Sequence, residues 1–185
     1  MKRTVSIIIA AVFCMALFAG TAIADQAKFA AFAKSSLAPI GQDKVVVKAV
    51  KAQNSKGITM DYIKKLDKAW KGNDPDTYFI KEIRDNKCSA HLRGIVGERN
   101  YLFEIFVMDN QGANVAMTDK TSDYWQGDEA KFNKSYNEGQ GAIFVDEVEF
   151  DDSAQAYLCQ VSVPVKDGGK VIGAVTIGID VDQIQ

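Results

Sequence analysis

The residues best suited to bind a small ligand lie in one short segment near the middle of the chain. Between Thr118 and Lys131 the sequence places two adjacent aromatic residues, Tyr124 and Trp125, among charged side chains. Such rings can form the wall of a pocket while their polar edges hydrogen-bond a ligand. The charged residues that could orient that ligand are Asp123, Asp128 and Lys131. The alternative is that one ring only anchors the segment while the charges face water.

A second group of acidic residues lies further along the chain, at Asp146, Glu147, Glu149, Asp151 and Asp152. Side chains alternate between the two faces of a strand, and no calcium-loop spacing is present. We therefore expect a solvated hairpin rim here and no metal site.

Signatures of catalysis are missing from the sequence. His91 is the only histidine, and no Ser or Cys nucleophile stands in a recognisable motif. Zinc spacings and phosphate-binding glycine loops are also absent. The chain carries 22 basic and 24 acidic residues. Because the net charge is negative and we identify no basic cluster after Lys2 and Arg3, nucleic acid is a poor candidate partner. The sequence predicts a protein that is not an enzyme and needs no cofactor.

The N-terminus has the pattern of an export signal. Lys2 and Arg3 precede an apolar run from Val5 to Phe18, and Ala22-Ile23-Ala24 supplies the small residues of a cleavage site. A retained membrane anchor is the alternative, but the run is short for a span of about 20 residues. We expect residues 1–24 to be a signal peptide cut after Ala24, and a periplasmic product.

Cleavage at that point removes Cys14 and leaves Cys88 and Cys159. Because disulfides persist in oxidising compartments, these two residues could form one. Two buried free thiols are equally compatible with the sequence.

The N-terminal half predicts helices. Apolar spacing indicates helices over 28–37, ending near Pro39, and over 58–70. The segment 44–53 combines β-branched valines with good helix formers, and we favour a helix. A further helix is predicted to begin with Asp74 as its cap and Pro75 at its first position, with an inner face of Tyr78, Phe79 and Ile83.

After Asn100 the pattern changes to alternation with regular turns. Strands are predicted over 104–109, 113–118, 142–150, 155–165 and 170–180, with one helix over 128–137. Hairpin connections imply an antiparallel sheet, and the early helices must cover one face of it. The expected fold class is α+β, with a five-stranded antiparallel sheet and long N-terminal helices packed on one face.

Several segments in this order resemble one family, the PAS-like extracytoplasmic sensor domains called Cache or PDC. They are Phe106-Val107-Met108-Asp109-Asn110-Gln111-Gly112, Tyr124-Trp125-Gln126-Gly127-Asp128, Gln160-Val161-Ser162-Val163-Pro164-Val165 and Val171-Ile172-Gly173-Ala174-Val175-Thr176-Ile177-Gly178-Ile179-Asp180. The resemblance implies a sensor domain over 57–185, preceded by a helical segment over 25–56. It also implies a metabolite pocket between the open face of the sheet and the loop and helix after the second strand.

The resemblance further suggests which residues line that pocket. In members that bind amino acids, Trp125 would match an aromatic wall, and Asp146 or Asp151 would accept the ligand amine. The arginine expected before the aromatic pair is replaced by Asp123-Tyr124, so a carboxylate clamp would have to come from Arg93 or Arg99. The remaining candidates are Tyr101, Tyr157 and Gln160.

From these observations we expect a small-molecule sensor domain for an organic acid, an amine or an amino-acid-like ligand. No output domain follows the last predicted strand, so we expect the signal to pass to a separate membrane-bound sensor kinase or chemoreceptor. The alternative is a protein-interaction module that binds the periplasmic part of such a receptor or kinase without a ligand.

Overall fold

The computed structural model describes residues 28–72, 78–151 and 155–184. The predicted signal peptide and the predicted cap at Asp74 and Pro75 lie outside these ranges. In the described part of the chain, none of the helices is long and apolar enough to cross a membrane.

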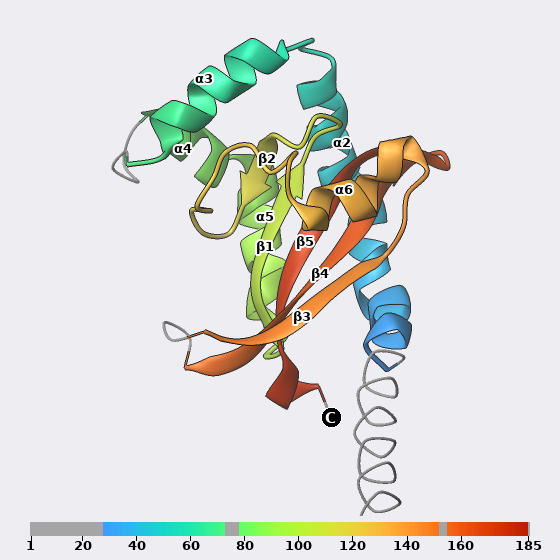
Figure 1. Ribbon diagram of the computed structural model, residues 1–185. Coiled ribbons are helices and arrows are strands. Elements are labelled where there is room, and N and C mark those ends of the chain that lie inside the picture. Colours follow the sequence, from blue (N-terminus) through green and yellow to red (C-terminus); the bar gives the residue numbers. More distant parts are fainter. Residues whose placement is uncertain (1–27, 73–77, 152–154, 185) are drawn as a thin grey trace, which may run out of the picture.

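The sheet has five antiparallel strands in the order β2-β1-β5-β4-β3. The strands are β1 (Leu102–Met108), β2 (Asn114–Met117), β3 (Phe144–Asp151), β4 (Ala156–Asp167) and β5 (Lys170–Asp180). Strands that follow one another pair as β1 with β2, β3 with β4 and β4 with β5, whereas β1 and β5 pair across a long sequence separation. This arrangement confirms the predicted α+β class, including all five strands (Figure 1).

Helices cover both faces of the sheet. On one face, α2 (Lys44–Asn54) and α5 (Lys87–Gly97) bury Val46, Val50 and Leu92 against residues of β1, β4 and β5. On the other side, α6 (Ala130–Tyr136) joins α3 (Met60–Trp70) and α4 (Tyr78–Arg84) in a second apolar cluster. Figure 1 shows α6 lying across the upper part of the long strands, so that their lower part stays uncovered on this side.

The predicted helix over 44–53 is present because Asp43 caps it, accepting hydrogen bonds from the backbone N–H groups of Val45 and Val46. The helix predicted over 28–37 is present, and its last five residues, Ala33–Leu37, form a π-helix. A 3₁₀ turn over Ala38–Gln42 follows it. Pro39 is tolerated because it lies at the start of that turn, where its missing N–H is not needed.

The predicted inner face of α4 is confirmed at Phe79 and Ile83 but is wrong at Tyr78. Tyr78 is 76% exposed, whereas Ile80 and Ile83 are buried and Phe79 packs against the second cluster. The helix begins at Tyr78, and Ile80 and Ile83 are one turn apart, so these two residues set the face that packs on the second cluster.

Candidate functional site

A row of three residues crosses the uncovered part of the sheet. Glu104 of β1 is paired with Gly178 of β5, which is paired with Gln160 of β4. The Glu104 side chain extends over Gly178, and its Oε1 accepts a hydrogen bond of 3.1 Å from Gln160 Nε2. A Cβ atom added to Gly178 would lie 2.7 Å from Glu104 Cγ. The glycine therefore provides the space in which the Glu104 carboxylate lies across β5.

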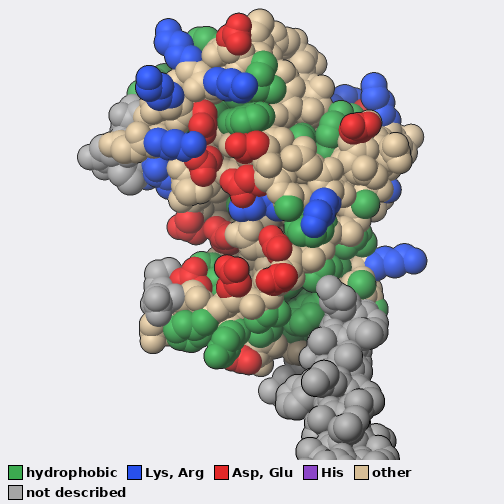
Figure 2. All heavy atoms as spheres, viewed as in Figure 1, with side chains coloured by type: hydrophobic (Ala, Val, Ile, Leu, Met, Phe, Trp, Pro, Cys, Tyr) green, Lys and Arg blue, Asp and Glu red, His purple; other side chains and the backbone are tan. Residues whose placement is uncertain are grey.

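This row forms the floor of a cavity of about 530 Å³, which we call the acidic cavity. Strand β3 contributes most of one wall, and the beginning of α6 contributes Glu129 and Lys131. The lining residues are Phe103, Glu104, Glu129, Lys131, Asp146, Glu147, Glu149, Phe150, Asp151, Leu158, Gln160 and Gly178. Six of them are carboxylates and only Lys131 is basic, so the cavity favours positive charge. Figure 2 shows acidic side chains gathered around the hollow below α6, with apolar side chains below them.

Two of the cavity's carboxylates have polar partners, Glu104 with Gln160 and Glu129 with Lys131. Burial raises the pKa of Glu104, while the hydrogen bond from Gln160 and the charge of Lys131 oppose that rise. Lys131 Nζ lies 2.8 Å from Glu129 Oε2 and 5.7 Å from the ring centroid of Phe106. The one cation of the lining is thus already paired with a carboxylate.

Two aromatic rings stand at the rim of this cavity. Phe150 lines it, and the ring of Tyr157 packs edge-on against Phe150 with 5.1 Å between centroids. Both side chains are about half exposed. Tyr157 therefore lies next to the cavity without lining it.

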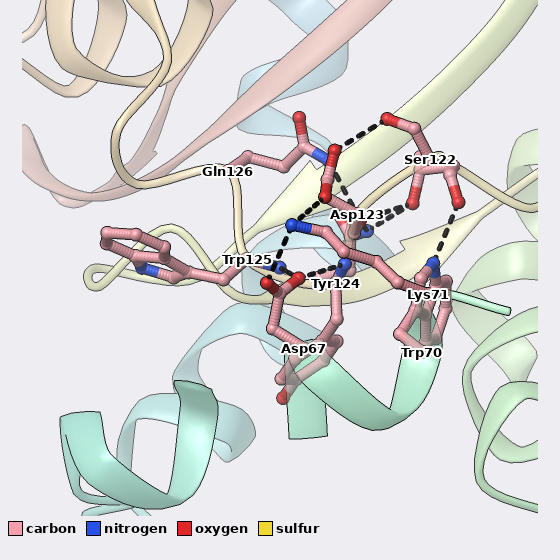
Figure 3. A network of polar contacts seen from close by, with 10 residues as sticks. Asp67, Trp70, Lys71, Ser122, Asp123, Tyr124, Trp125 and Gln126 are labelled. Carbon is pink, nitrogen blue, oxygen red and sulfur yellow. Dashed lines mark hydrogen bonds and ion pairs between the residues drawn. The ribbon is translucent and has the colours of Figure 1, made fainter. Parts of the chain in front are cut away.

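The segment that carries Tyr124 and Trp125, which we call the aromatic connector, is attached to α3 by the carboxylate of Asp67 (Figure 3). Asp67 Oδ1 accepts hydrogen bonds from the backbone N–H groups of Tyr124 at 2.9 Å and Trp125 at 3.0 Å. Lys71, one turn further along the chain, binds both Asp67 Oδ2 and Asp123 Oδ1. Burial raises the pKa of Asp123, but the hydrogen bonds from Lys71 and Ser122 and the charges of Lys71 and Lys131 together outweigh it, so the pKa is lowered.

Trp125 is held as an anchor. Its indole N–H donates to the carbonyl of Gln111 at 2.8 Å, and Lys64 Nζ lies 5.4 Å from the ring centroid. It does not line the acidic cavity. The structure thus favours the anchoring interpretation of this residue.

Tyr124 is 1% exposed and packs against Trp70 and Phe79 in the second apolar cluster. It also lines a separate cavity of about 370 Å³, bounded by α3, α4 and β2. Burial raises the pKa of its phenol above the usual value. The two adjacent aromatic residues therefore contact different surroundings, which the sequence does not reveal.

Of the other residues predicted to bind a ligand, some line the acidic cavity and some do not. Asp146, Asp151 and Gln160 line the acidic cavity, whereas Asp128 is exposed. Tyr101 packs against Phe32 beside the core of α2 and α5, away from the cavity.

Neither arginine nor the histidine reaches the acidic cavity. Arg93 donates a hydrogen bond to the carbonyl of Arg84, and Arg99 keeps a buried Nη1 without a partner in the described chain. His91 Nε2 lies 3.1 Å from Asp43 Oδ2 at the beginning of α2. The carboxylate clamp considered for the arginines is therefore not formed.

Cys88 and Cys159 are free thiols in the structure. Both are buried in the apolar core beneath α2 and α5, and burial raises the pKa of Cys88 to about 12 and of Cys159 to about 11. The sequence is compatible with a disulfide or with two buried free thiols, and the structure contains the free thiols.

Sequence patterns did not single out Glu104, Glu147, Glu149 or Gly178 as cavity residues. A signal for Glu104 was present, because it is the one charged residue within the apolar strand Leu102–Met108. A charge in such a strand indicates a polar site on one face. Its neighbours across the sheet depend on the pairing of β1 with β5, which joins segments far apart in the sequence.

No protein-family model matches the sequence, and a search of curated proteins finds no significant match. Solved structures with a similar arrangement include sensor domains. The sensory domain of the Campylobacter jejuni chemoreceptor Tlp3 with isoleucine bound has 18% identity and a TM-score of 0.40, over 77% of this chain and 58% of that one. The sensor domain of the V. cholerae histidine kinase DctB has 14% identity and a TM-score of 0.42, over 97% and 58%.

A third structure is the ligand-binding domain of the Pseudomonas aeruginosa amino acid chemoreceptor PctC in complex with GABA. It has 12% identity and a TM-score of 0.42, over 75% of this chain and 59% of that one. The chain thus spans less than two thirds of the length of these domains. These three structures are sensory or ligand-binding domains of two chemoreceptors and one histidine kinase.

Proposed function

We propose that this protein is a periplasmic sensor domain that binds a small amine in the acidic cavity and does not transform it. The observation that carries the proposal is the cavity itself: about 530 Å³ on the uncovered part of the sheet, lined by six carboxylates and one paired lysine. Its volume falls within the range of small-molecule sites, roughly 300–1,000 Å³.

The lining distinguishes among the three ligand classes that the sequence left open. An organic acid would place its charge beside Asp146, Glu147 and Glu149, which repel it. An amino acid needs a cation for its carboxylate, yet Lys131 is already bound to Glu129 at 2.8 Å. A ligand with one or more ammonium groups and no carboxylate fits the lining best.

The carboxylates surround the cavity and do not converge on one point. In the described part of the chain, no group of three or more His, Cys, Asp or Glu side chains is placed to hold a metal ion. Separated acceptors suit an organic cation with spaced ammonium groups, such as a linear diamine. Phe150 and Phe103 add apolar surface for its methylene chain.

The signalling role remains part of the proposal. The export pattern of residues 1–24 supports a periplasmic location, and the amine would alter how the domain contacts a membrane-bound kinase or chemoreceptor. Direct binding of such a receptor without a ligand is the alternative function.

Calorimetric titration of the domain with a linear diamine, a monoamine, a dicarboxylate and a neutral amino acid tests the proposal. We expect the diamine to bind, and Glu104→Gln and Asp146→Asn each to weaken binding about tenfold, the usual size of a lost charge contact. Asp61→Asn is the matched control, because it removes one exposed carboxylate of α3 outside the cavity. Binding of the dicarboxylate, or equal loss in the control, would contradict the proposal.

A further inference from the structure

A second hollow lies on another part of the surface and has the opposite charge. It runs between α2 and the turn that joins β4 to β5, and its volume is about 570 Å³. We call it the basic groove. Its lining residues are Gln42, Lys44, Val47, Lys48, Lys51, Lys166, Asp167, Gly168 and Gly169. None of them lines the acidic cavity.

Three of its lysines form a stripe along α2. Lys44, Lys48 and Lys51 are separated by four and three residues, so they project from one side of the helix. All three are exposed, and Val47 beside them is half-buried. The stripe extends over about 10 Å of helix, and Val47 is the one apolar side chain that lines the groove beside it.

The opposite wall is formed by the β4–β5 turn. Lys166 adds a fourth cation there, and Asp167 Oδ2 lies 2.7 Å from Lys51 Nζ. Lys44, Lys48 and Lys166 have no ion-pair partner within the part of the chain that the structure describes. Gly168 and Gly169 add no side chains to this wall, and the space beside them is open, because nothing lies within 4 Å of a Cβ atom added at either position.

The spacing of the charges indicates the shape of the anion that fits them. A compact anion such as phosphate needs donors that converge on one point, whereas these lysines are spaced about 5–6 Å apart along a line. An extended strand presents every second side chain on one face at intervals of about 6.6 Å. Alternate carboxylates of an extended segment would therefore follow the stripe.

We propose that the basic groove is a docking site for an extended acidic segment of a partner protein. The proposal goes beyond ligand binding in the acidic cavity, since it concerns other residues on another surface. The acidic cavity and the basic groove are connected through β4 and β5. These strands carry Gln160 and Gly178 of the cavity, and at their other end Asp167 forms the ion pair with Lys51 of α2. The site is suited to a receptor segment whose contact would depend on the state of these strands.

Fluorescence anisotropy with a labelled dodecapeptide of alternating glutamate and serine tests the proposal. We expect the peptide to bind at low salt, with affinity falling as salt is added because the contacts are solvent-exposed ion pairs. The triple variant Lys44→Gln/Lys48→Gln/Lys51→Gln should bind at least tenfold more weakly.

The control variant is Lys65→Gln/Lys68→Gln/Lys87→Gln, which removes the same charge from exposed lysines outside the groove. It should keep its affinity within about threefold, as expected for long-range screened charges. Thermal denaturation of both variants establishes that they fold. Inorganic phosphate at matched ionic strength should not displace the peptide.

Three results would overturn the proposal. They are equal loss of binding in both triple variants, displacement by phosphate alone, and binding of phosphatidylglycerol vesicles in preference to the peptide. Each is independent of whether a diamine binds the acidic cavity, so the failure of one proposal leaves the other intact.

Discussion

Gln160 on β4 donates a hydrogen bond of 3.1 Å to the Glu104 carboxylate on β1, across the intervening strand β5. The contact is formed because the residue between them is Gly178. A side chain at that position would occupy the path of Glu104. One glycine thus brings a carboxylate and an amide together at the floor of the acidic cavity.

The first prediction concerns that glycine. Gly178→Ala places a methyl group 2.7 Å from the present position of Glu104 Cγ and forces the side chain to move. We expect diamine affinity to fall about tenfold, the loss of one charged hydrogen bond. Titration calorimetry measures the change, with Gly94→Ala on α5, where an added Cβ meets nothing within 4 Å, as the control. Unchanged affinity in Gly178→Ala would show that Glu104 does not position the ligand.

The second prediction follows from the raised pKa of Glu104. Because burial favours the protonated form in the folded state, ionisation of Glu104 at neutral pH costs folding free energy. Glu104→Gln should therefore stabilise the unliganded protein at neutral pH by on the order of 1 kcal/mol, or roughly 2–4 °C in Tm. It should also weaken diamine binding.

The sign of this effect fixes its pH dependence. Below the ordinary pKa of 4.5 the carboxyl is protonated in both folded and unfolded chains, so the advantage of the variant should disappear there. The advantage should grow as pH rises from 4.5 through the raised pKa. Thermal denaturation across this range gives the answer, and a variant less stable than the parent at neutral pH would contradict the argument.

The third prediction concerns the link between α3 and the connector. Asp67→Ala leaves the N–H groups of Tyr124 and Trp125 without their acceptor and removes one partner of Lys71. We expect a loss of about 2–3 kcal/mol in the free energy of unfolding, the range for charged hydrogen bonds. Chemical denaturation measures the loss, and hydrogen exchange should rise at Tyr124 and Trp125. Asp61→Ala, an exposed site on the same helix, should cost less than about 1 kcal/mol.

The fourth prediction addresses a buried hydroxyl pair under α6. Ser162 Oγ and Thr176 Oγ1 lie 2.8 Å apart on neighbouring strands, and both residues are fully buried. Ser162→Ala or Thr176→Val alone leaves one hydroxyl unpaired and should cost about 1–3 kcal/mol. The double variant should cost less than the sum of the two. A double-mutant cycle by denaturant titration measures the coupling free energy between the two hydroxyls. Strict additivity of the two single losses would mean that the pair is not coupled.

The fifth prediction concerns the two cysteines. Because burial raises the pKa of both thiols far above neutral pH, neither should react with iodoacetamide in the folded protein. After denaturation without reductant, Cys88 and Cys159 should each gain one alkyl group by mass spectrometry. Alkylation only after addition of a reductant would instead demonstrate a disulfide.

Local patterns in the sequence were sufficient for most of the secondary structure. Alternation and turn residues placed all five strands and the helix over 130–136 within a few residues, because each of these signals acts over a few neighbouring positions. The same reasoning failed at Tyr78. The orientation of a seven-residue helix depends on which side meets the core, and Ile80 and Ile83 provide the larger apolar contact.

The candidate cavity contains only some of the residues predicted to bind a ligand. Asp146 and Asp151 were named as amine acceptors, and they do line the acidic cavity. Trp125 was favoured as a pocket wall, whereas the structure fastens it to Gln111 and Asp67. Aromatic residues in a polar loop look alike in sequence whether they contact a ligand or the fold, because both uses need the same apolar surface and polar edge.

The sequence by itself determined the class of the fold, the position of each strand and the presence of an acidic hairpin. Only the tertiary structure decided which acidic side chains face one another. Pairing of β1 with β5, and of β5 with β4, brings Glu104, Gly178 and Gln160 into one row, although 56 residues separate Glu104 from Gln160 in the chain. Strand register is a property of the whole sheet, since it depends on how both faces are buried, and no local pattern specifies it.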